Sequence, residues 1–198
     1  MASGAPTDVC KAADVRHGAG SRNFSTVRRE RASPGAPRDL AHKIDCGLIA
    51  HVANSVGIHK DSEDMVYVRQ YAAASSNLRM KTAEGNRVVD KGAEEGIMGV
   101  LRGKSDLNQL QLGRYRTKIR QYEAASHGAP KPPEGQAKAK AFHEEMRQLV
   151  DALAAVSDNT KTRGVTVKEG KRIISRHFRE GIPQATEEKA SAARVVAK

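Results

Sequence analysis

The sequence is poor in aromatic side chains: Trp is absent, and the three Phe and four Tyr make up only 4% of the 198 residues. Hydrophobic residues of all kinds reach 38%, so a core has to be assembled mainly from Leu, Ile, Val, Met and Ala. Such a composition suits helices packed on helices. A short chain also buries a smaller fraction of its surface than a long one. We therefore expect self-association or contact with other protein subunits.

Cysteines and long apolar runs are scarce as well. Only Cys10 and Cys46 are present, and two cysteines form neither the framework of a disulfide-rich domain nor a zinc cluster. No apolar run approaches the roughly 18 residues needed to span a bilayer, and residues 1–30 lack the apolar stretch of a secretory signal. These absences predict a protein of a reducing compartment, cytoplasmic or within a nucleoprotein particle, without a membrane partner. An export signal read by a specialised secretion machine would escape this test.

No motif in the sequence has the spacing of a catalytic or metal site. The seven histidines show neither the HxxxH nor the HExxH pattern, so we expect no metal. The segment Gly99–Ser105 resembles a phosphate-binding loop, but it is one residue short between its glycines and follows no strand-like run. Cys46 and His51 are five residues apart, which places them about 140° apart around one helix and prevents a thiol–imidazole pair. We therefore expect no enzymatic activity and no cofactor.

Positive charge is what the chain has in excess. Lys and Arg number 34 against 23 Asp and Glu, which gives a net charge of +11 and a pI near 9.9. The excess is +3 over residues 1–40, −1 over 41–100, +6 over 101–140 and +3 over 141–198. Such a surplus attracts phosphate backbones. We expect a nucleic acid, RNA or DNA, as the partner; a solvated surface of mixed charge is the alternative interpretation.

Composition divides the chain into five segments. Residues 1–37 are rich in Gly, Pro, Ser and Arg and lack apolar periodicity, which predicts a flexible basic arm. Pro130, Pro132 and Pro133 cannot lie together in a helix interior, so residues 126–136 are predicted to form a linker or a rigid elbow. The other expected segments are a helical domain at 38–125, a helical hairpin at 137–182 and a charged tail at 183–198.

Apolar periodicity predicts a mainly α fold, a small bundle of about five to six helices with a disordered arm and tail. Residues that cap or stop helices set the expected ends, such as Asp61 at a helix start and Gly57 and Gly128 beyond helix ends. The expected helices cover about residues 38–57, 61–75, 97–101, 105–127, 137–157 and 166–180.

Residues 77–90 fit two structures. Leu78, Met80 and Thr82 alternate, Gly85 and Asn86 can form a turn, and the pair Val88–Val89 can return as a second strand. This pattern is compatible with a short β-hairpin. An isolated two-stranded ribbon is marginal in water, so we favour a connection between helices.

Three basic clusters are candidate nucleic-acid-binding surfaces, in the arm, in the 105–127 helix and on the last helix, where the cations step by four, four and three. The candidate residues are Arg28, Arg29, Arg31, Arg114, Arg116, Lys118, Arg120, Lys168, Arg172, Arg176 and Arg179. Tyr115 and Tyr122 lie among the second cluster and can stack on bases. Their spacing with Ile119 favours packing in the core.

The sequence as a whole predicts a non-enzymatic, basic structural protein that binds nucleic acid, as a subunit of a nucleoprotein or viral-type assembly. The last two predicted helices resemble a helix-turn-helix, but their connection, Ser157–Val165, is longer than the usual three or four residues. The alternative is a secreted bacterial effector or adaptor, whose arm is an export signal and whose helices bind a partner protein.

Overall fold

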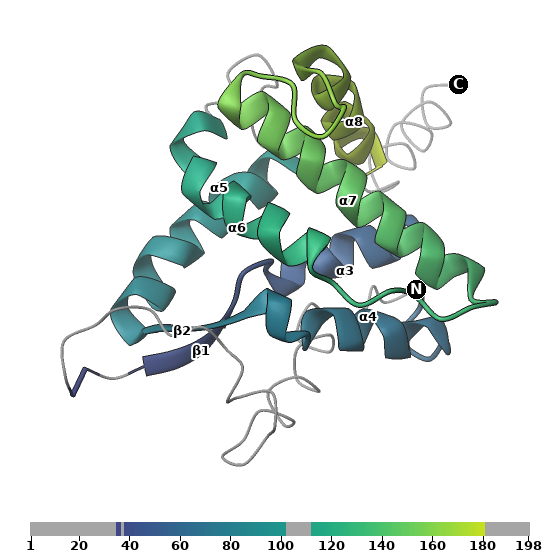
Figure 1. Ribbon diagram of the computed structural model, residues 1–198, viewed down its shortest axis with the longest axis horizontal. Coiled ribbons are helices and arrows are strands. Elements are labelled where there is room, and N and C mark those ends of the chain that lie inside the picture. Colours follow the sequence, from purple (N-terminus) through teal and green to yellow (C-terminus); the bar gives the residue numbers. More distant parts are fainter. Residues whose placement is uncertain (1–34, 37, 102–111, 181–198) are drawn as a thin grey trace, which may run out of the picture.

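The computed structural model describes residues 35–36, 38–101 and 112–180 (Figure 1). These ranges are mainly helical, which confirms the predicted fold class, and they contain six α-helices and one two-stranded antiparallel sheet. None of the helices in the described part has the length and apolarity required to cross a membrane. The α-helices are α3 (Cys46–Ser55), α4 (Asp64–Ala72), α5 (Lys91–Leu101), α6 (Arg116–His127), α7 (Ala137–Asp158) and α8 (Val167–Glu180).

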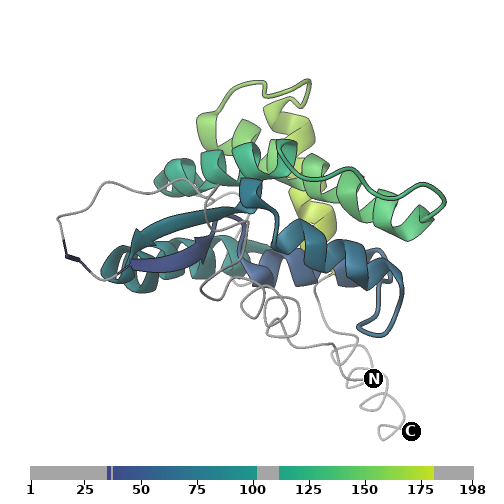
Figure 2. The same ribbon diagram turned by 60° about the horizontal axis from the view of Figure 1, so that its bottom comes forward.

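The sheet pairs two segments that are far apart in the sequence. Strand β1 (Arg38–His42) runs antiparallel to β2 (Leu78–Thr82), with Leu40 opposite Met80. Figure 2 shows the two strands at the opposite end of the molecule from the α3–α4 connection. The prediction of one helix over 38–57 is therefore wrong in its first part. Leu40 fits the helical spacing of α3, but its backbone hydrogen bonds go to a distant strand, which local periodicity does not reveal.

Helix α3 begins at Cys46 because Asp45 caps it. The Asp45 Oδ1 accepts a hydrogen bond of 2.8 Å from the Leu48 backbone N–H, and the Asp45 backbone is extended. A carboxylate that accepts from the third residue on satisfies one of the free N–H groups of a helix start. The helix ends at Ser55, and Gly57 follows with a φ of +73°, as the predicted glycine stop requires.

The hairpin alternative, in which Val88–Val89 returns as a second strand, is not formed. These two residues lie in a π-helical segment, η2 (Gly85–Asp90), that leads directly into α5. Asp90 at its end contacts Arg79 and, at 2.6 Å, Lys81 of β2. These ion pairs hold the helical segment beside the strand, and the backbone partner of β2 is β1.

Asn77 joins β1 to the centre of the fold. It ends a short 3₁₀ segment, η1 (Ser75–Asn77), and is almost completely buried. Its side-chain Oδ1 accepts a 2.7 Å hydrogen bond from the Ile44 N–H, and its backbone carbonyl accepts one of 2.6 Å from the Lys43 N–H. The amide nitrogen donates to the carbonyl oxygen of Ala72 at 3.0 Å. A buried amide that is satisfied on both sides fixes the path of both chain segments.

One hydrophobic cluster extends from Ile44 in the N-terminal half to Ile174 in α8. It is made almost entirely of aliphatic residues, and its aromatic members include Tyr71, Tyr122 and Phe142. Residues on both sides of the predicted 126–136 linker belong to it. The Pro-rich segment is thus a connection across a shared core, and not a boundary between separate cores.

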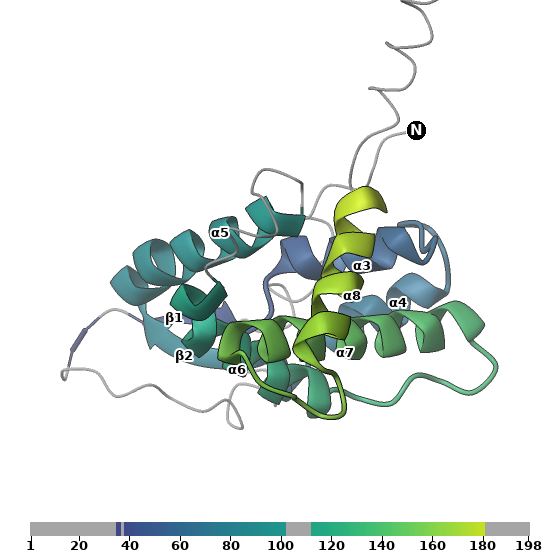
Figure 3. The same cartoon turned by 90° about the horizontal axis from the view of Figure 1, so that it is seen from above.

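Helix α8 crosses α7 and reaches α3 (Figure 3). The crossing is close at Gly170, where an added Cβ would lie 2.9 Å from the Ala152 carbonyl oxygen of α7. Farther along α8, the buried His177 places its Nδ1 3.2 Å from the Nε2 of His51 in α3. A 22-residue α7 with helices on either side is therefore the central element to which α8 is fixed.

Candidate nucleic-acid interface

The first turns of α6 lie against the end of α7, where two arginines share one carboxylate. The Arg116 Nε is 2.6 Å from Asp158 Oδ1, and the Arg120 Nη2 is 3.5 Å from Asp158 Oδ2. Arg116 also donates a 3.3 Å hydrogen bond to the backbone oxygen of Ser157. Both arginine side chains are largely exposed, at 50% and 63%. One negative charge balances only one of the two guanidinium groups, so a positive charge remains at the surface.

The connection between α7 and α8 folds back onto α6. Asn159 and Arg163 adopt left-handed backbone conformations, and Thr162 pairs with Val165 through two short backbone hydrogen bonds. This tight turn brings the Arg163 Nε to 3.5 Å from Glu123 Oε1 of α6. Arg163 therefore lies against α6 at a residue one turn beyond Arg120.

We call this surface the basic face, and define it by exposed cations of α6, of the segment before it, of the α7–α8 connection and of the first turns of α8. Its members are Arg114, Arg116, Arg120, Lys161, Arg163, Lys168, Lys171 and Arg172. The acidic residues of the same segments are Glu123, Asp158 and Glu169. Cations outnumber carboxylates, so the basic face carries a net positive charge at neutral pH.

The four cations of the predicted stripe on α8 do not share one environment. Lys168 and Arg172 are exposed. Arg176 contacts Glu145 of α7, and its side chain is 47% exposed. Arg179 lies in the last turn of α8, and its side chain is outside the described part of the structure. The opposite side of α8 is buried at Ile174, which leaves the Lys168–Arg172 side of the helix at the surface.

Lys118, predicted as a nucleic-acid contact, is 4% exposed. Its ammonium lies 2.6 Å from Glu94 Oε1 and 3.7 Å from Asp90 Oδ2. Burial raises the pKa of Glu94 more than the adjacent Lys118 charge lowers it. For Asp90 the balance is reversed. Burial raises its pKa, but hydrogen bonds and charge from Lys81, Lys118 and Arg79 together lower the pKa by more, so it lies below the ordinary value. Lys118 thus belongs to an interior ion-pair network and is not part of the basic face.

The two tyrosines of α6 and its preceding 3₁₀ segment, η4 (Leu112–Tyr115), pack inward. Tyr122 is completely buried, and its hydroxyl donates a 2.7 Å hydrogen bond to Asp45 Oδ2. Burial, followed by the charge of Asp45, raises the Tyr122 pKa. Tyr115 is partly buried against the same core. Tyr122 therefore offers no open face to a base, and the core contact of both rings explains their spacing with Ile119.

The structure brings Arg114, Arg116 and Arg120 to the same end of the molecule as the start of α8. The arm residues Arg28, Arg29 and Arg31 lie outside the described residues. Sequence reasoning missed Lys161, Arg163 and Lys171. The first two lie in a connection, where no helical stripe can be recognised, although their closeness in sequence to Lys168 was an available signal.

The structure describes part of the phosphate-loop look-alike and Cys46, the two features that the sequence offered as catalytic candidates. Gly99, Val100 and Leu101 of the phosphate-loop look-alike lie within α5 and follow no strand, and residues 102–105 lie outside the described residues. Cys46 is disulfide-bonded, so it presents no free thiol. This bond differs from the free thiols that a reducing compartment favours. No cluster of three or more His, Cys, Asp or Glu side chains within residues 38–101 and 112–180 is arranged to hold a metal ion.

Comparisons with protein-family models, with curated proteins and with solved structures found no match to this chain.

Proposed function

We propose that this chain is a non-enzymatic nucleic-acid-binding protein, a structural subunit of a nucleoprotein assembly, and that the basic face contacts the phosphate backbone. The observation that carries the proposal is the sharing of Asp158 by Arg116 and Arg120, beside Arg163. Three guanidinium groups from two segments converge where only two carboxylates are available.

In the ion pairs of the basic face, a phosphate can replace the carboxylate. A surface ion pair between exposed side chains contributes only about 0–1 kcal/mol to stability. A phosphate oxygen can therefore replace the Asp158 carboxylate at Arg120 at little cost to the fold. Arginine also binds phosphate through two parallel N–H groups, which gives a stronger hydrogen-bonding geometry than a lysine ammonium.

Contacts of this kind position a protein on the backbone without reading the bases. The basic face has no exposed aromatic ring among its defining residues, and Tyr122 is buried. The expected binding is therefore largely independent of sequence, with affinity supplied by release of counterions from the nucleic acid.

The experiment is a salt titration of binding to mixed-sequence duplex DNA and to RNA. We expect nanomolar to micromolar affinity at about 50 mM salt, and a linear fall of log affinity with log salt concentration. Tight binding that does not change with salt, or no binding to either polymer at low salt, excludes the proposal.

The alternative function is a protein-interaction module, such as a secreted effector or adaptor. Exposed Val88 and Val89 on η2 favour it, because their side chains are 67% and 65% exposed and lie next to each other. Adjacent exposed apolar residues are found at protein contacts. Replacing both with Ser would weaken capture of a protein partner and leave the salt-dependent binding to nucleic acid unchanged.

A further inference from the structure

A cleft of about 620 Å³ opens between the Pro-rich connection and the N-terminal half of α7. Its walls include Lys131, Pro132, His143 and Arg147. The volume is within the range of roughly 300–1,000 Å³ that is typical of small-molecule sites. The cleft is separate from the basic face, whose residues come from α6, the α7–α8 connection and α8.

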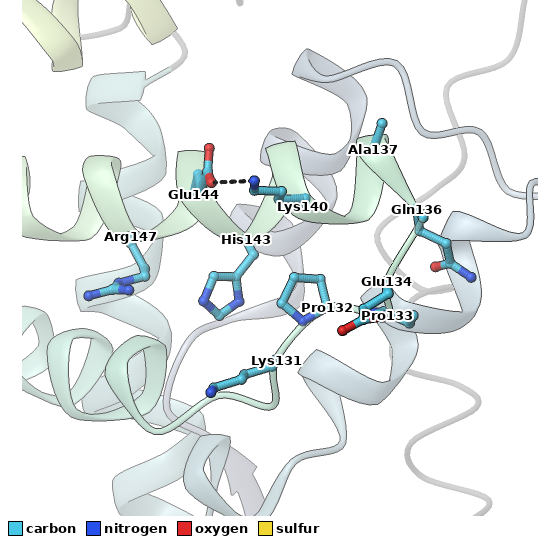
Figure 4. A pocket seen from close by; sticks show the side chains of 11 residues that line it. Lys131, Pro132, Pro133, Glu134, Gln136, Ala137, Lys140, His143, Glu144 and Arg147 are labelled. Carbon is cyan, nitrogen blue, oxygen red and sulfur yellow. Dashed lines mark ion pairs between the residues drawn. The ribbon is translucent and has the colours of Figure 1, made fainter.

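The cations of the cleft gather around one space. Figure 4 shows Lys131, His143 and Arg147 on one side of the α7 ribbon, whereas Lys140 and Glu144, which also line the cleft, lie on the other side of the ribbon and pair with each other. The Lys140–Glu144 distance is 4.0 Å, so these two charges balance each other. Neither Lys131 nor Arg147 forms an ion pair with another side chain in the described part of the chain.

The tautomer of His143 follows from its partner. The Tyr67 hydroxyl is 2.7 Å from the Pro130 carbonyl oxygen and 2.7 Å from His143 Nδ1. A carbonyl oxygen can only accept, so the hydroxyl proton goes to Pro130 and the Tyr67 oxygen accepts from Nδ1–H. This arrangement leaves Nε2 as the ring nitrogen available to a ligand. Tyr67 itself is held by edge contacts with Tyr71 and Phe142.

The walls combine an apolar surface with this polar group. Pro132 lies beside the imidazole of His143 in Figure 4, and Pro133 lines the cleft next to it; proline rings offer a rigid apolar wall without a backbone N–H. Glu134 also lines the cleft, on the far side of Pro132 from Arg147 in Figure 4. A ligand that fits has a flat apolar body and an anionic group directed away from Glu134.

We propose that this cleft binds a small organic anion, with an apolar ring between Pro132 and His143 and a carboxylate or phosphate between Lys131 and Arg147. The anion accepts hydrogen bonds from the guanidinium and the ammonium, and the ring displaces water from the proline surface. Neither contact involves a residue of the basic face, so the proposal does not depend on nucleic-acid binding.

The experiment titrates the full chain with benzoate, phenyl phosphate, inorganic phosphate and benzylamine, followed through the NMR signals of the His143 imidazole and by calorimetry. We expect saturable binding of benzoate or phenyl phosphate, and the stronger of the two identifies the anionic group. Inorganic phosphate should bind more weakly because it lacks the ring. Binding of benzylamine as tight as that of benzoate would overturn the proposal, as would the absence of saturation for both anions.

Variants then locate the site. Arg147→Gln should weaken binding of the preferred anion by about tenfold or more, the loss of one charge-assisted hydrogen bond. His143→Asn keeps a donor near the Nδ1 position for Tyr67 but removes Nε2 and the ring wall, so it should also weaken binding. Arg172→Gln, on the basic face, is the matched control and should leave the affinity unchanged. Equal affinities for Arg147→Gln and the parent chain would contradict the assignment. Thermal unfolding of each variant establishes that the comparison is made on folded protein.

Discussion

The Lys118 ammonium lies 2.6 Å from the Glu94 carboxylate, inside the fold, although Lys118 is flanked in the sequence by the exposed Arg116 and Arg120. On α6 the two arginines and the lysine are two residues apart, which turns each successive side chain by about 200° around the helix axis. Arg116 and Arg120 therefore share one side, and Lys118 takes the other. The Lys118 charge stabilises the contact of α6 with α5, and its burial prevents contact with a ligand at the surface.

Removal of the Lys118 charge should destabilise the fold without affecting the basic face. We expect Lys118→Met to lower the free energy of unfolding by about 3 kcal/mol, because it leaves the buried Asp90 and part-buried Glu94 carboxylates with fewer partners. Arg120→Met, which removes an exposed ion pair, should cost less than about 1 kcal/mol. Urea unfolding measures both values. Equal losses for the two variants would show that Lys118 does not contribute through burial.

Lys118 illustrates which features of the fold can be predicted from the sequence and which depend on packing. Periodicity predicted α7 and α8 nearly to the residue, because Phe142, Met146 and Leu149 recur at helical spacing and Gly181 follows the end of α8. It also selected Arg116 and Arg120 as candidates, and the structure leaves both side chains exposed. The burial of Lys118 depends on the position of Glu94, which is 24 residues away and acquires its role only through packing.

The strand at 38–42 was missed for a similar reason. Leu40 and Ile44 are four residues apart and fit an α-helix as well as a strand followed by a turn. The choice is made by pairing with Leu78–Thr82 and by the hydrogen bonds of the buried Asn77. Both are long-range contacts, whose formation cannot be deduced from neighbouring residues. The cleft at His143 was likewise unpredictable, because it needs Tyr67 from another helix.

The crossing of α7 by α8 depends on Gly170. An alanine Cβ at this position would meet the Ala152 carbonyl oxygen at 2.9 Å and Val156 Cγ2 at 3.1 Å. We expect Gly170→Ala to destabilise the protein by about 1–3 kcal/mol through overpacking. Gly99→Ala in α5 is the control, because nothing lies within 4 Å of its added Cβ. There the higher helix propensity of alanine should stabilise the protein by up to about 1 kcal/mol. Thermal unfolding compares them; a stabilised Gly170→Ala would contradict the close crossing.

Acid should weaken the attachment of α8 through Glu145. A hydrogen bond from His177 lowers the pKa of Glu145; burial raises it by less, and the charge of Arg176 lowers it further, so the folded pKa lies below the ordinary 4.5. The carboxylate therefore stabilises the fold fully above about pH 4.5, and this contribution is lost as the pH falls through the folded pKa.

The pH dependence of this stabilisation can be measured with Glu145→Gln. The variant should be less stable than the parent at pH 6, and the difference should shrink as the pH falls below 4.5 and through the lowered pKa of Glu145, because the parent side chain then becomes neutral as well. The exposed Glu144→Gln, whose parent carboxylate is 4.0 Å from Lys140, should change stability little over the same pH range. A stability difference for Glu145→Gln that grows on acidification would show that the ionised carboxylate does not stabilise α8.

The salt dependence of nucleic-acid binding, compared between two variants of equal charge, tests the central claim most directly. Arg120→Gln/Arg172→Gln removes two cations from the basic face, and Lys60→Gln/Lys91→Gln removes two exposed cations outside it. Each phosphate contact contributes about −0.9 to the slope of log affinity against log salt on duplex DNA. We predict that the first variant loses about two units of slope magnitude, whereas the second keeps the parental slope. The same slope for both variants would contradict a binding surface at the basic face.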